Sequence, residues 1–323
     1  MIILTGGAGF IGSVLLKRLN ENGITDILIV DEFDSSEKWK NLLGKQFDDY
    51  CHKDDFLEYL EEELDKDDVD AVFHLGACTS TTERDVDYLM QNNFQFSKSL
   101  AEWCFWAEKP FIYASSASTY GDGLNGFSDD THKAINYRPL NAYGFSKHIF
   151  DLWLIENNYD EECTGFKFFN VFGPNEYHKG SMASLIYKAY HQVIESGELK
   201  LFKSHNPTYK DGEFLRDFIH VNDCVDVLMW SLHNPNIKGI FNLGTGKARS
   251  WNDLASALFL AMGKDKKIEY IDMPKEIRSS YQYFTQADMG KLRKAGYSKA
   301  FAELEDAVKD YIQNYLMKPQ PYL

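Results

Sequence analysis

A glycine-rich segment directly after the first apolar run constrains the fold more than any other feature of this sequence. Met1–Leu4 is a run of strand length, and Thr5-Gly6-Gly7-Ala8-Gly9-Phe10-Ile11-Gly12 follows it. Ser13–Leu19 continues with helical spacing, and Asp31 ends the next apolar run. Glycines in this context permit a tight turn, let backbone approach a pyrophosphate, and present helix N–H groups to it. The segment predicts a dinucleotide site at the start of the chain.

Apolar runs of strand length recur through the first half and alternate with segments of helical spacing. This alternation predicts an α/β fold built on a Rossmann-type doubly wound parallel sheet. The expected strands are Met1–Leu4, Ile27–Val30, Ala71–Leu75 and Phe111–Ala114, with further core strands at Phe218–Val221 and Ile240–Leu243.

The second half is less regular and predicts a smaller, interleaved α/β substrate-binding lobe, with Asn170–Lys203 and Met273–Lys299 as candidate segments. One helix in it is well marked, because Ser250 and Asp253 have the spacing of a capping box and Gly263 ends the helical pattern. We expect residues 1–170, joined by about 216–250, to form the dinucleotide-binding domain. Residues 171–215 and 251–323 then form the substrate-binding lobe.

Composition limits the classes of function. The net charge of −15 over 323 residues argues against general binding to nucleic acid or to an anionic membrane. No apolar run reaches membrane-spanning length, and the first residues do not have the pattern of a signal peptide. We therefore expect a cytoplasmic protein. Its scattered cysteines favour neither a disulfide framework nor a metal site; they are Cys51, Cys78, Cys104, Cys163 and Cys224.

A candidate catalytic pair follows the expected strand at Phe111. That strand ends in Ser115-Ser116, and Tyr143 and Lys147 follow with the i, i+4 spacing that places both on one helix face. An ammonium there favours phenolate, lowers the tyrosine pKa and can hold a nicotinamide ribose, while Ser116 can orient a substrate hydroxyl. Such groups move a proton while a cofactor takes a hydride.

Together these motifs resemble the extended short-chain dehydrogenase/reductase family over nearly the whole chain. Arg216-Asp217-Phe218-Ile219-His220-Val221 and Asn242-Leu243-Gly244-Thr245-Gly246 are further landmarks of that family. Three segments are more specific and resemble its ADP-heptose 6-epimerase group. They are Gly76-Ala77-Cys78-Thr79-Ser80-Thr81-Thr82-Glu83, His178-Lys179-Gly180-Ser181-Met182-Ala183-Ser184 and Tyr281-Gln282-Tyr283-Phe284-Thr285-Gln286-Ala287-Asp288.

This resemblance implies a reaction and its components. The expected activity converts ADP-D-glycero-D-manno-heptose to ADP-L-glycero-D-manno-heptose, a donor for the lipopolysaccharide core, by oxidation at C6, rotation of the intermediate and re-reduction. It implies a tightly bound nicotinamide cofactor, NADP or alternatively NAD, no metal, and a homo-oligomer, with a pentamer suggested by the family.

The resemblance also assigns residues. Tyr143 and Lys179 are the expected acid/base pair, one for each substrate orientation. Lys147 is expected to support Tyr143 and the cofactor, and Ser116 to orient the substrate hydroxyl. The expected cofactor-binding residues are Gly6, Gly9, Phe10, Ile11, Gly12, Asp31, Glu32, Lys38, Lys53, Leu75, Gly76, Ala77, Cys78, Thr79, Asn92, Lys147 and Val171. The expected substrate-binding residues are Asn170, Ser181, Lys188, Phe202, Lys203, Ser204, His205, Arg216 and Tyr281, with Arg216 suited to a diphosphate.

Three positions depart from the pattern of the group. Glu32 stands where Asn is usual, and a second acid beside Asp31 disfavours a 2′-phosphate, whereas Lys38 and Lys53 would favour one. Lys188 replaces a familiar His, and the segment 206–214 is longer than usual, which affects the alignment of Lys203–His205.

Two other interpretations compete with this one: another nucleotide-sugar enzyme, either a 4-epimerase or a 4,6-dehydratase, and a dinucleotide-binding protein without turnover. A nucleotide-sugar 4-epimerase is compatible with the glycine segment and the Tyr143/Lys147 pair but does not explain His178–Ser184. A 4,6-dehydratase is disfavoured because Ser116 is followed by Ala117, Ser118 and Thr119, with no carboxylate. A dinucleotide-binding protein without turnover is also disfavoured, because both members of the catalytic pair are present.

Overall fold

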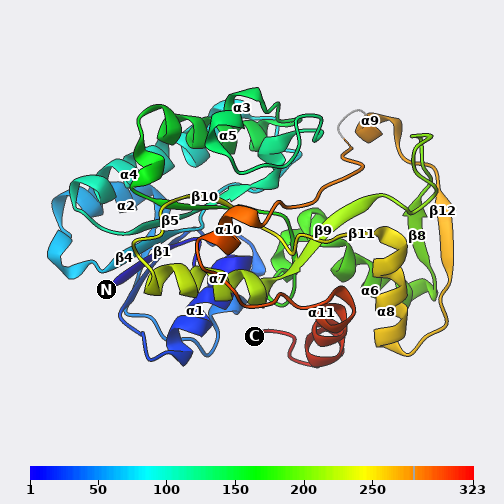
Figure 1. Ribbon diagram of the computed structural model, residues 1–323. Coiled ribbons are helices and arrows are strands. Elements are labelled where there is room, and N and C mark those ends of the chain that lie inside the picture. The colour runs from blue at the N-terminus through cyan, green and yellow to red at the C-terminus, as the bar shows by residue number, and fades with distance from the viewer. Residues whose placement is uncertain (279–280) are drawn as a thin grey trace.

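A central sheet of seven parallel strands organises the protein, for which a computed structural model describes residues 1–278 and 281–323. The strand order is β10-β6-β5-β4-β1-β2-β3, and it reverses between β1 and β4. The strands are apolar along most of their length because helices cover both faces (Figure 1). They are β1 (Ile2–Thr5), β2 (Ile27–Asp31), β3 (Asp49–His52), β4 (Ala71–His74), β5 (Phe111–Ser116), β6 (Thr164–Phe168) and β10 (Gly239–Leu243).

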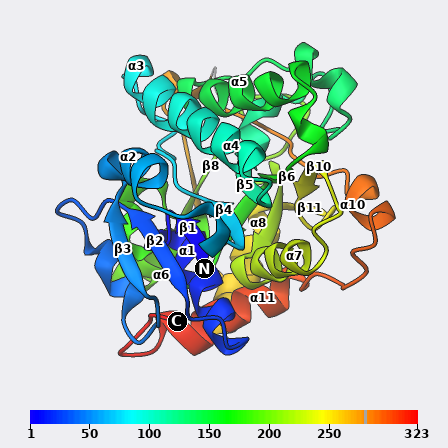
Figure 2. The same ribbon diagram turned by 90° about the vertical axis from the view of Figure 1, so that its left-hand side faces the viewer.

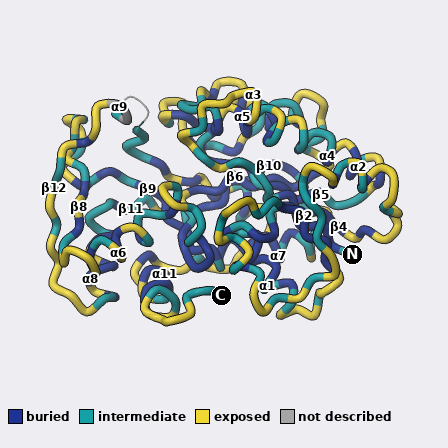
Figure 3. The backbone as a smooth tube through the Cα atoms, turned by 180° about the vertical axis from the view of Figure 1, so that it is seen from behind, coloured by how far each residue is buried: buried dark blue, intermediate teal, exposed yellow. Residues whose placement is uncertain are grey.

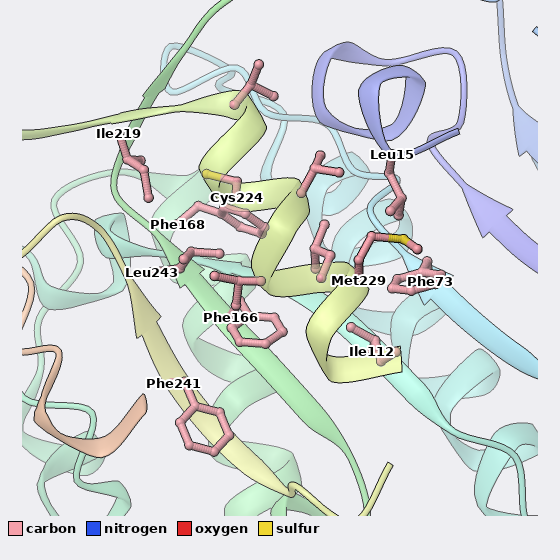
Figure 4. Close-up of a cluster of buried hydrophobic side chains, with 14 of the residues drawn as sticks. Leu15, Phe73, Ile112, Phe166, Phe168, Ile219, Cys224, Met229, Phe241 and Leu243 are labelled. Atoms are coloured by element: carbon pink, nitrogen blue, oxygen red, sulfur yellow. The ribbon is translucent and has the colours of Figure 1, made fainter. Parts of the chain in front are cut away.

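Two groups of helices cover the two faces of this sheet, which confirms the doubly wound fold. One face carries α1 (Phe10–Glu21) and α7 (Val221–His233), and the other carries α2 (Lys53–Glu62), α4 (Phe96–Trp106) and α5 (Ala142–Glu156) (Figure 2). In Figure 4, Cys224 of α7 lies near Phe168, and Met229 of the same helix lies near Phe73 of the sheet and Leu15 of α1.

The burial pattern follows from these layers. Buried residues concentrate in the central strands and along the inner sides of the helices that cover them (Figure 3). Within residues 1–278 and 281–323, no helix combines the length and the apolar character that crossing a membrane requires.

A second lobe lies beyond the carboxyl ends of the central strands. It contains the parallel pair β8 (Leu199–Phe202) and β12 (Ile268–Ile271) with α6 (Leu185–Ser196), α8 (Trp251–Met262) and α11 (Leu304–Tyr311) (Figure 1). The apolar faces of its helices form a core of their own, with Val193, Leu258 and Val308 fully buried.

The sequence markers of α8 are confirmed in detail. The Ser250 hydroxyl accepts from the Asp253 N–H at 3.0 Å, and the Asp253 carboxylate accepts from the Ser250 N–H at 3.1 Å. Gly263 ends the helix at φ +64°, in the left-handed region that glycine adopts most readily.

A third, small sheet joins the two lobes, with strand order β11-β9-β7. Its strands are β7 (Asn170–Phe172), β9 (Leu215–His220) and β11 (Ala248–Ser250). The run predicted at Phe218–Val221 is therefore a buried strand of this sheet that continues into α7, and it does not belong to the central sheet. Because β9 and β11 flank α7 and β10 in the chain, the polypeptide leaves the central sheet and returns to it.

The remaining α-helices among the described residues are short: α3 (Val86–Leu89), α9 (Lys275–Arg278) and α10 (Gly290–Lys294). Two of them fall in the candidate segment Met273–Lys299, whose residues 279–280 lie outside the described residues. The exact boundaries of the two expected domains stay a prediction.

Candidate active site

A cleft of about 1120 Å³ opens where the strand order reverses, between the two lobes. Thr5, Asp31 and Ser116, the last residues of three central strands, line one side, and residues of α6 and β8 line the other. Ligands of open parallel sheets bind at this position. The cleft is therefore the candidate active site.

The glycine segment shapes the first part of the cleft. Gly9 is the N-cap of α1, no side chain of the described residues forms a capping hydrogen bond there, and the first turn contains no acidic residue. A Cβ added to Gly12 would lie 2.1 Å from the Gly6 carbonyl oxygen, and Gly6 itself has φ +70°. The open helix N-terminus and the closely approaching backbone fit a pyrophosphate, so these residues fit a dinucleotide cofactor.

Four charged side chains gather where the second strand ends. The Asp31 carboxylate accepts from the Ala8 N–H at 2.8 Å and from Lys38 Nζ at 2.7 Å. Glu32 lies 3.4 Å from Lys53 Nζ, and all four charged side chains line the cleft. The two lysines therefore fold back to this end of the cleft, and two carboxylates accompany them.

A chain of buried hydrogen bonds holds the cleft residues Leu75–Thr79 in place. Asn93 accepts from the Cys78 N–H at 2.9 Å and donates to the Cys78 carbonyl at 2.9 Å and to the Ser146 hydroxyl at 3.0 Å. Ser146 in turn donates to the Tyr143 carbonyl at 2.8 Å. One buried amide thus links this loop to the helix that carries Tyr143.

Tyr143 and Lys147 lie on the first turns of α5, and both line the cleft together with Ser116. Asn141 is the N-cap of this helix, and its side chain accepts from the Gly144 N–H at 2.7 Å. Burial lowers the pKa of Lys147 to about 8, although Asp151 opposes the shift.

The expectation that the tyrosine pKa is lowered is wrong for this structure. Burial raises the pKa of Tyr143, and the hydrogen bond with Ser116 only partly offsets it. The acidic groups Cys78 and Asp151 act in the same direction as burial, because they also disfavour the phenolate.

Beneath these residues lies a buried ion pair that sequence reasoning did not predict. Lys167 donates to Asp151, which also accepts from the Tyr113 hydroxyl at 2.9 Å and the Ser115 hydroxyl at 2.8 Å. Asp151 is one turn along α5 from Lys147, and Ser115 precedes Ser116. The pair therefore links the strand and the helix that carry the candidate catalytic residues.

Lys179 approaches the cleft from the segment between β7 and α6. Its Nζ lies 5.6 Å from the centroid of the Phe10 ring, and the side chain lines the cleft. Partial burial lowers its pKa, and Glu176 opposes that shift. Tyr143 and Lys179, which are far apart in the sequence, therefore border one cavity.

Most of the predicted binding residues line the cleft. All the predicted cofactor residues do so, as do Asn170, Ser181, Lys188, Phe202 and Tyr281. Lys203, Ser204 and His205 are not among the lining residues: Lys203 lies 3.5 Å from Asp272, and the Ser204 N–H donates to Asp211 at 2.7 Å.

Arg216 is also absent from the cleft wall. Its guanidinium lies 5.3 Å from the ring centroid of Tyr281 and 5.9 Å from that of Trp251, and it donates to the Leu215 carbonyl at 3.0 Å. Burial lowers its pKa. The structure therefore places Arg216 behind two aromatic side chains that face the cavity.

Sequence reasoning missed several residues of the cleft. Trp251 fits the apolar pattern of α8, yet its indole N–H donates to the Tyr281 hydroxyl at 3.0 Å and its ring lines the cleft. The others include Phe96, Glu176, Ser184, Gln192 and Lys200. Ser184 belongs to the segment His178–Ser184 but was given no role, and the proximity of Glu176 to Lys179 in the sequence was a usable signal. No local motif marks Phe96, Gln192 and Lys200.

Comparisons with known proteins agree with this geometry. Residues 2–244 match the model of the NAD dependent epimerase/dehydratase family. The chain is 53% identical over 323 residues to an ADP-L-glycero-D-manno-heptose-6-epimerase of Nitratidesulfovibrio vulgaris (strain Hildenborough), covering 100% of both. It is 48% identical to that of Fusobacterium nucleatum subsp. nucleatum, again covering 100% of both.

A solved structure extends the comparison to the fold. The crystal structure of Helicobacter pylori ADP-L-glycero-D-manno-heptose-6-epimerase superimposes with a TM-score of 0.81 at 29% identity, covering 97% of this chain and 95% of that chain. The family match, the two full-length relatives and this fold lead to one assignment. The chain belongs to the NAD dependent epimerase/dehydratase family, in the group of the ADP-L-glycero-D-manno-heptose-6-epimerases.

Proposed function

We propose that this protein interconverts ADP-D-glycero-D-manno-heptose and ADP-L-glycero-D-manno-heptose by inversion at C6. The observation that carries the proposal is the pair of proton-transfer groups on one cleft, Tyr143 from α5 and Lys179 from the segment before α6. Full-length identity of 53% to an enzyme named for this reaction supports the substrate.

The proposed roles follow from the chemistry of inversion. When bound, the nicotinamide dinucleotide supplies reversible hydride transfer at C6. A proton must leave the C6 hydroxyl when C6 becomes a ketone. It must return after the intermediate has rotated in the cleft and C6 has been reduced again. One group fixed in the cleft cannot serve both orientations equally well, so Tyr143 takes one and Lys179 the other. Lys147 and Ser116 hold Tyr143 and the ligands in place.

Inversion at C6 is tested directly with the proposed substrate. Incubation with ADP-D-glycero-D-manno-heptose should produce the L-glycero epimer, seen as new C6 signals in the NMR spectrum, without added reductant or net change in nicotinamide absorbance. Inversion at C4 of a different nucleotide sugar, with none at C6 of this one, would instead support the 4-epimerase alternative. Absence of turnover with either substrate would contradict an enzymatic role.

For the cofactor we propose NADP, because Lys38 and Lys53 offer two ammonium groups where a 2′-phosphate would lie. Asp31 and Glu32 offset them, so the preference over NAD is expected to be modest. Replacing Glu32 with Asn frees Lys53 from one carboxylate and should raise the NADP-to-NAD affinity ratio on the order of tenfold.

The measurement is release of cofactor from denatured protein, followed by titration of both dinucleotides. NADP should predominate in the supernatant of the wild-type protein. Lys38→Ala is the matched control and should lower the affinity ratio. If NAD alone is released and Glu32→Asn leaves the ratio unchanged, NADP is the wrong assignment. Homo-oligomeric assembly stays a prediction.

A further inference from the structure

One buried carboxylate links the two ends of the segment that carries Lys179. Glu176, 1% exposed, accepts from the Gly173 N–H at 3.4 Å and from the Ser184 hydroxyl at 2.7 Å. Its second oxygen accepts from the Ser184 N–H. Gly173 follows β7 and Ser184 is the N-cap of α6, so this side chain joins the start of the segment to its end.

The first part of the same segment is hydrogen-bonded to elements on the cofactor side of the cleft. Asn175 is fully buried at φ +74° and donates to the Ser13 hydroxyl on α1 at 2.9 Å. Its carbonyl accepts from Asn41 at 3.1 Å, and Asn41 also donates to the Ala8 carbonyl in the glycine segment at 2.9 Å. Because this part of the segment is held in place, the path of residues 177–183 depends on the hydrogen bonds that Glu176 makes to the two ends of the segment.

Glu176 also supplies the negative charge that acts on Lys179. The two side chains form no direct ion pair among the described residues. The Lys179 N–H donates to the Glu176 carbonyl at 3.0 Å, and the charge of the carboxylate opposes the lowering of the Lys179 pKa by burial. Other titratable groups around them are Tyr311 on α11, Tyr187 and Lys188 on α6, and His178 beside Lys179. For Lys179 itself, Glu176 is the charged group that opposes the effect of burial.

We propose that Glu176 is a positioning residue for Lys179: it closes the 173–184 segment and holds a compensating charge beside the lysine. The inference rests on the proposed role of Lys179 in proton transfer. A carboxylate that accepts several hydrogen bonds stays anchored, so the lysine keeps one approach to C6 instead of moving with a loose loop.

The sign of the electrostatic effect does not depend on which half-reaction Lys179 serves. Neutralising Glu176 removes a charge that favours the ammonium, so the Lys179 pKa falls. If Lys179 must begin neutral, the limb of the pH–rate profile in which activity rises with pH moves down. If it must begin charged, the limb in which activity falls moves down.

The test compares pH–rate profiles of C6 inversion for Glu176→Gln and the wild-type protein. We expect a lower kcat and a shift of one limb by about one pH unit toward lower pH. Glu176→Asp keeps the charge but is too short to reach both ends of the segment, so kcat should fall while the limb stays in place. Asp223→Asn is the matched control, because Asp223 is a buried carboxylate that accepts from the Ala302 N–H at 3.0 Å outside the cleft. It should leave the profile unchanged.

Ser184→Ala provides a second route if Glu176→Gln does not fold. It removes one donor to the carboxylate but keeps the charge, so it should lower kcat without moving either limb. A wild-type kcat for Ser184→Ala, or a wild-type profile for Glu176→Gln, would overturn the inference. Lys179→Met separates this failure from failure of the proposed function: if Lys179→Met inverts C6 at the wild-type rate, the role of Lys179 itself is wrong.

Discussion

Tyr143→Phe and Lys179→Met are each expected to lower the rate of net C6 inversion by about 10³-fold, because proton transfer by a positioned side chain contributes on this scale. Inversion needs proton transfer in both orientations of the sugar, so loss of either group stops the complete reaction. NMR of the C6 signals measures the loss. Both folded proteins should retain cofactor, since neither substitution removes a charge that the dinucleotide phosphates require.

Half-reactions separate the two residues. A nucleotide-sugar analogue with an aldehyde at C6 can disproportionate, with one molecule oxidised while another is reduced. Each single variant should still catalyse this on one face, and the two should differ in which face of the C6 aldehyde receives the hydride. Lys147→Ala is the control: it should impair both orientations and weaken cofactor binding. If Lys179→Met inverts C6 at the wild-type rate, Tyr143 serves both faces.

Asp151→Asn is expected to lower the free energy of unfolding by about 3–5 kcal/mol, because it leaves the buried Lys167 without its counter-charge. The two side chains are only 1% and 5% exposed, so water cannot replace the lost interaction. Urea unfolding measures the change as a lower midpoint at unchanged slope. Since Asp151 also binds Ser115, kcat should fall in the folded fraction.

Two further variants test the cause of that loss. Adding Lys167→Met removes the orphaned charge, so the double variant should be more stable than Asp151→Asn alone. Glu102→Ala breaks the exposed pair with Lys98 on α4, whose side chains are 34% and 50% exposed, and should change stability by less than about 1 kcal/mol. A loss from Asp151→Asn no larger than that of Glu102→Ala would contradict the buried-pair account.

Strands with continuous apolar sequence could be predicted, and those without it could not. Ile27–Val30 and Ile240–Leu243 were predicted because every position is buried on a covered sheet. β3, Asp49-Tyr50-Cys51-His52, is a half-exposed edge strand and lacks such a run. β6 lies within the sheet, but Lys167 interrupts its apolar pattern, and only the distant Asp151 makes that charge tolerable there.

In the candidate site, too, residues in local sequence patterns could be predicted, and residues brought in by tertiary packing could not. The glycine segment and the i, i+4 pair are local patterns whose chemistry follows from spacing, so Gly12 and Tyr143 could be named from the sequence. Trp251 and Glu176 reach the cleft through tertiary packing, which no local pattern describes. Arg216 was expected to meet the substrate diphosphate, yet stacking against Tyr281 and Trp251 keeps it from the cleft wall in this structure.

The position of β10 at the edge of the central sheet has a consequence for biosynthesis. It pairs with β6, but the chain between them, residues 169–238, first builds β7, α6, β8 and β9 and then α7. While the chain emerges from the ribosome, the sheet face later covered by α7 stays exposed until residue 233 has been made, and the free edge of β6 stays exposed until residue 243 has been made. Folding of the nucleotide half therefore waits for much of the second lobe, and the nascent protein is most vulnerable to edge-to-edge aggregation in that interval.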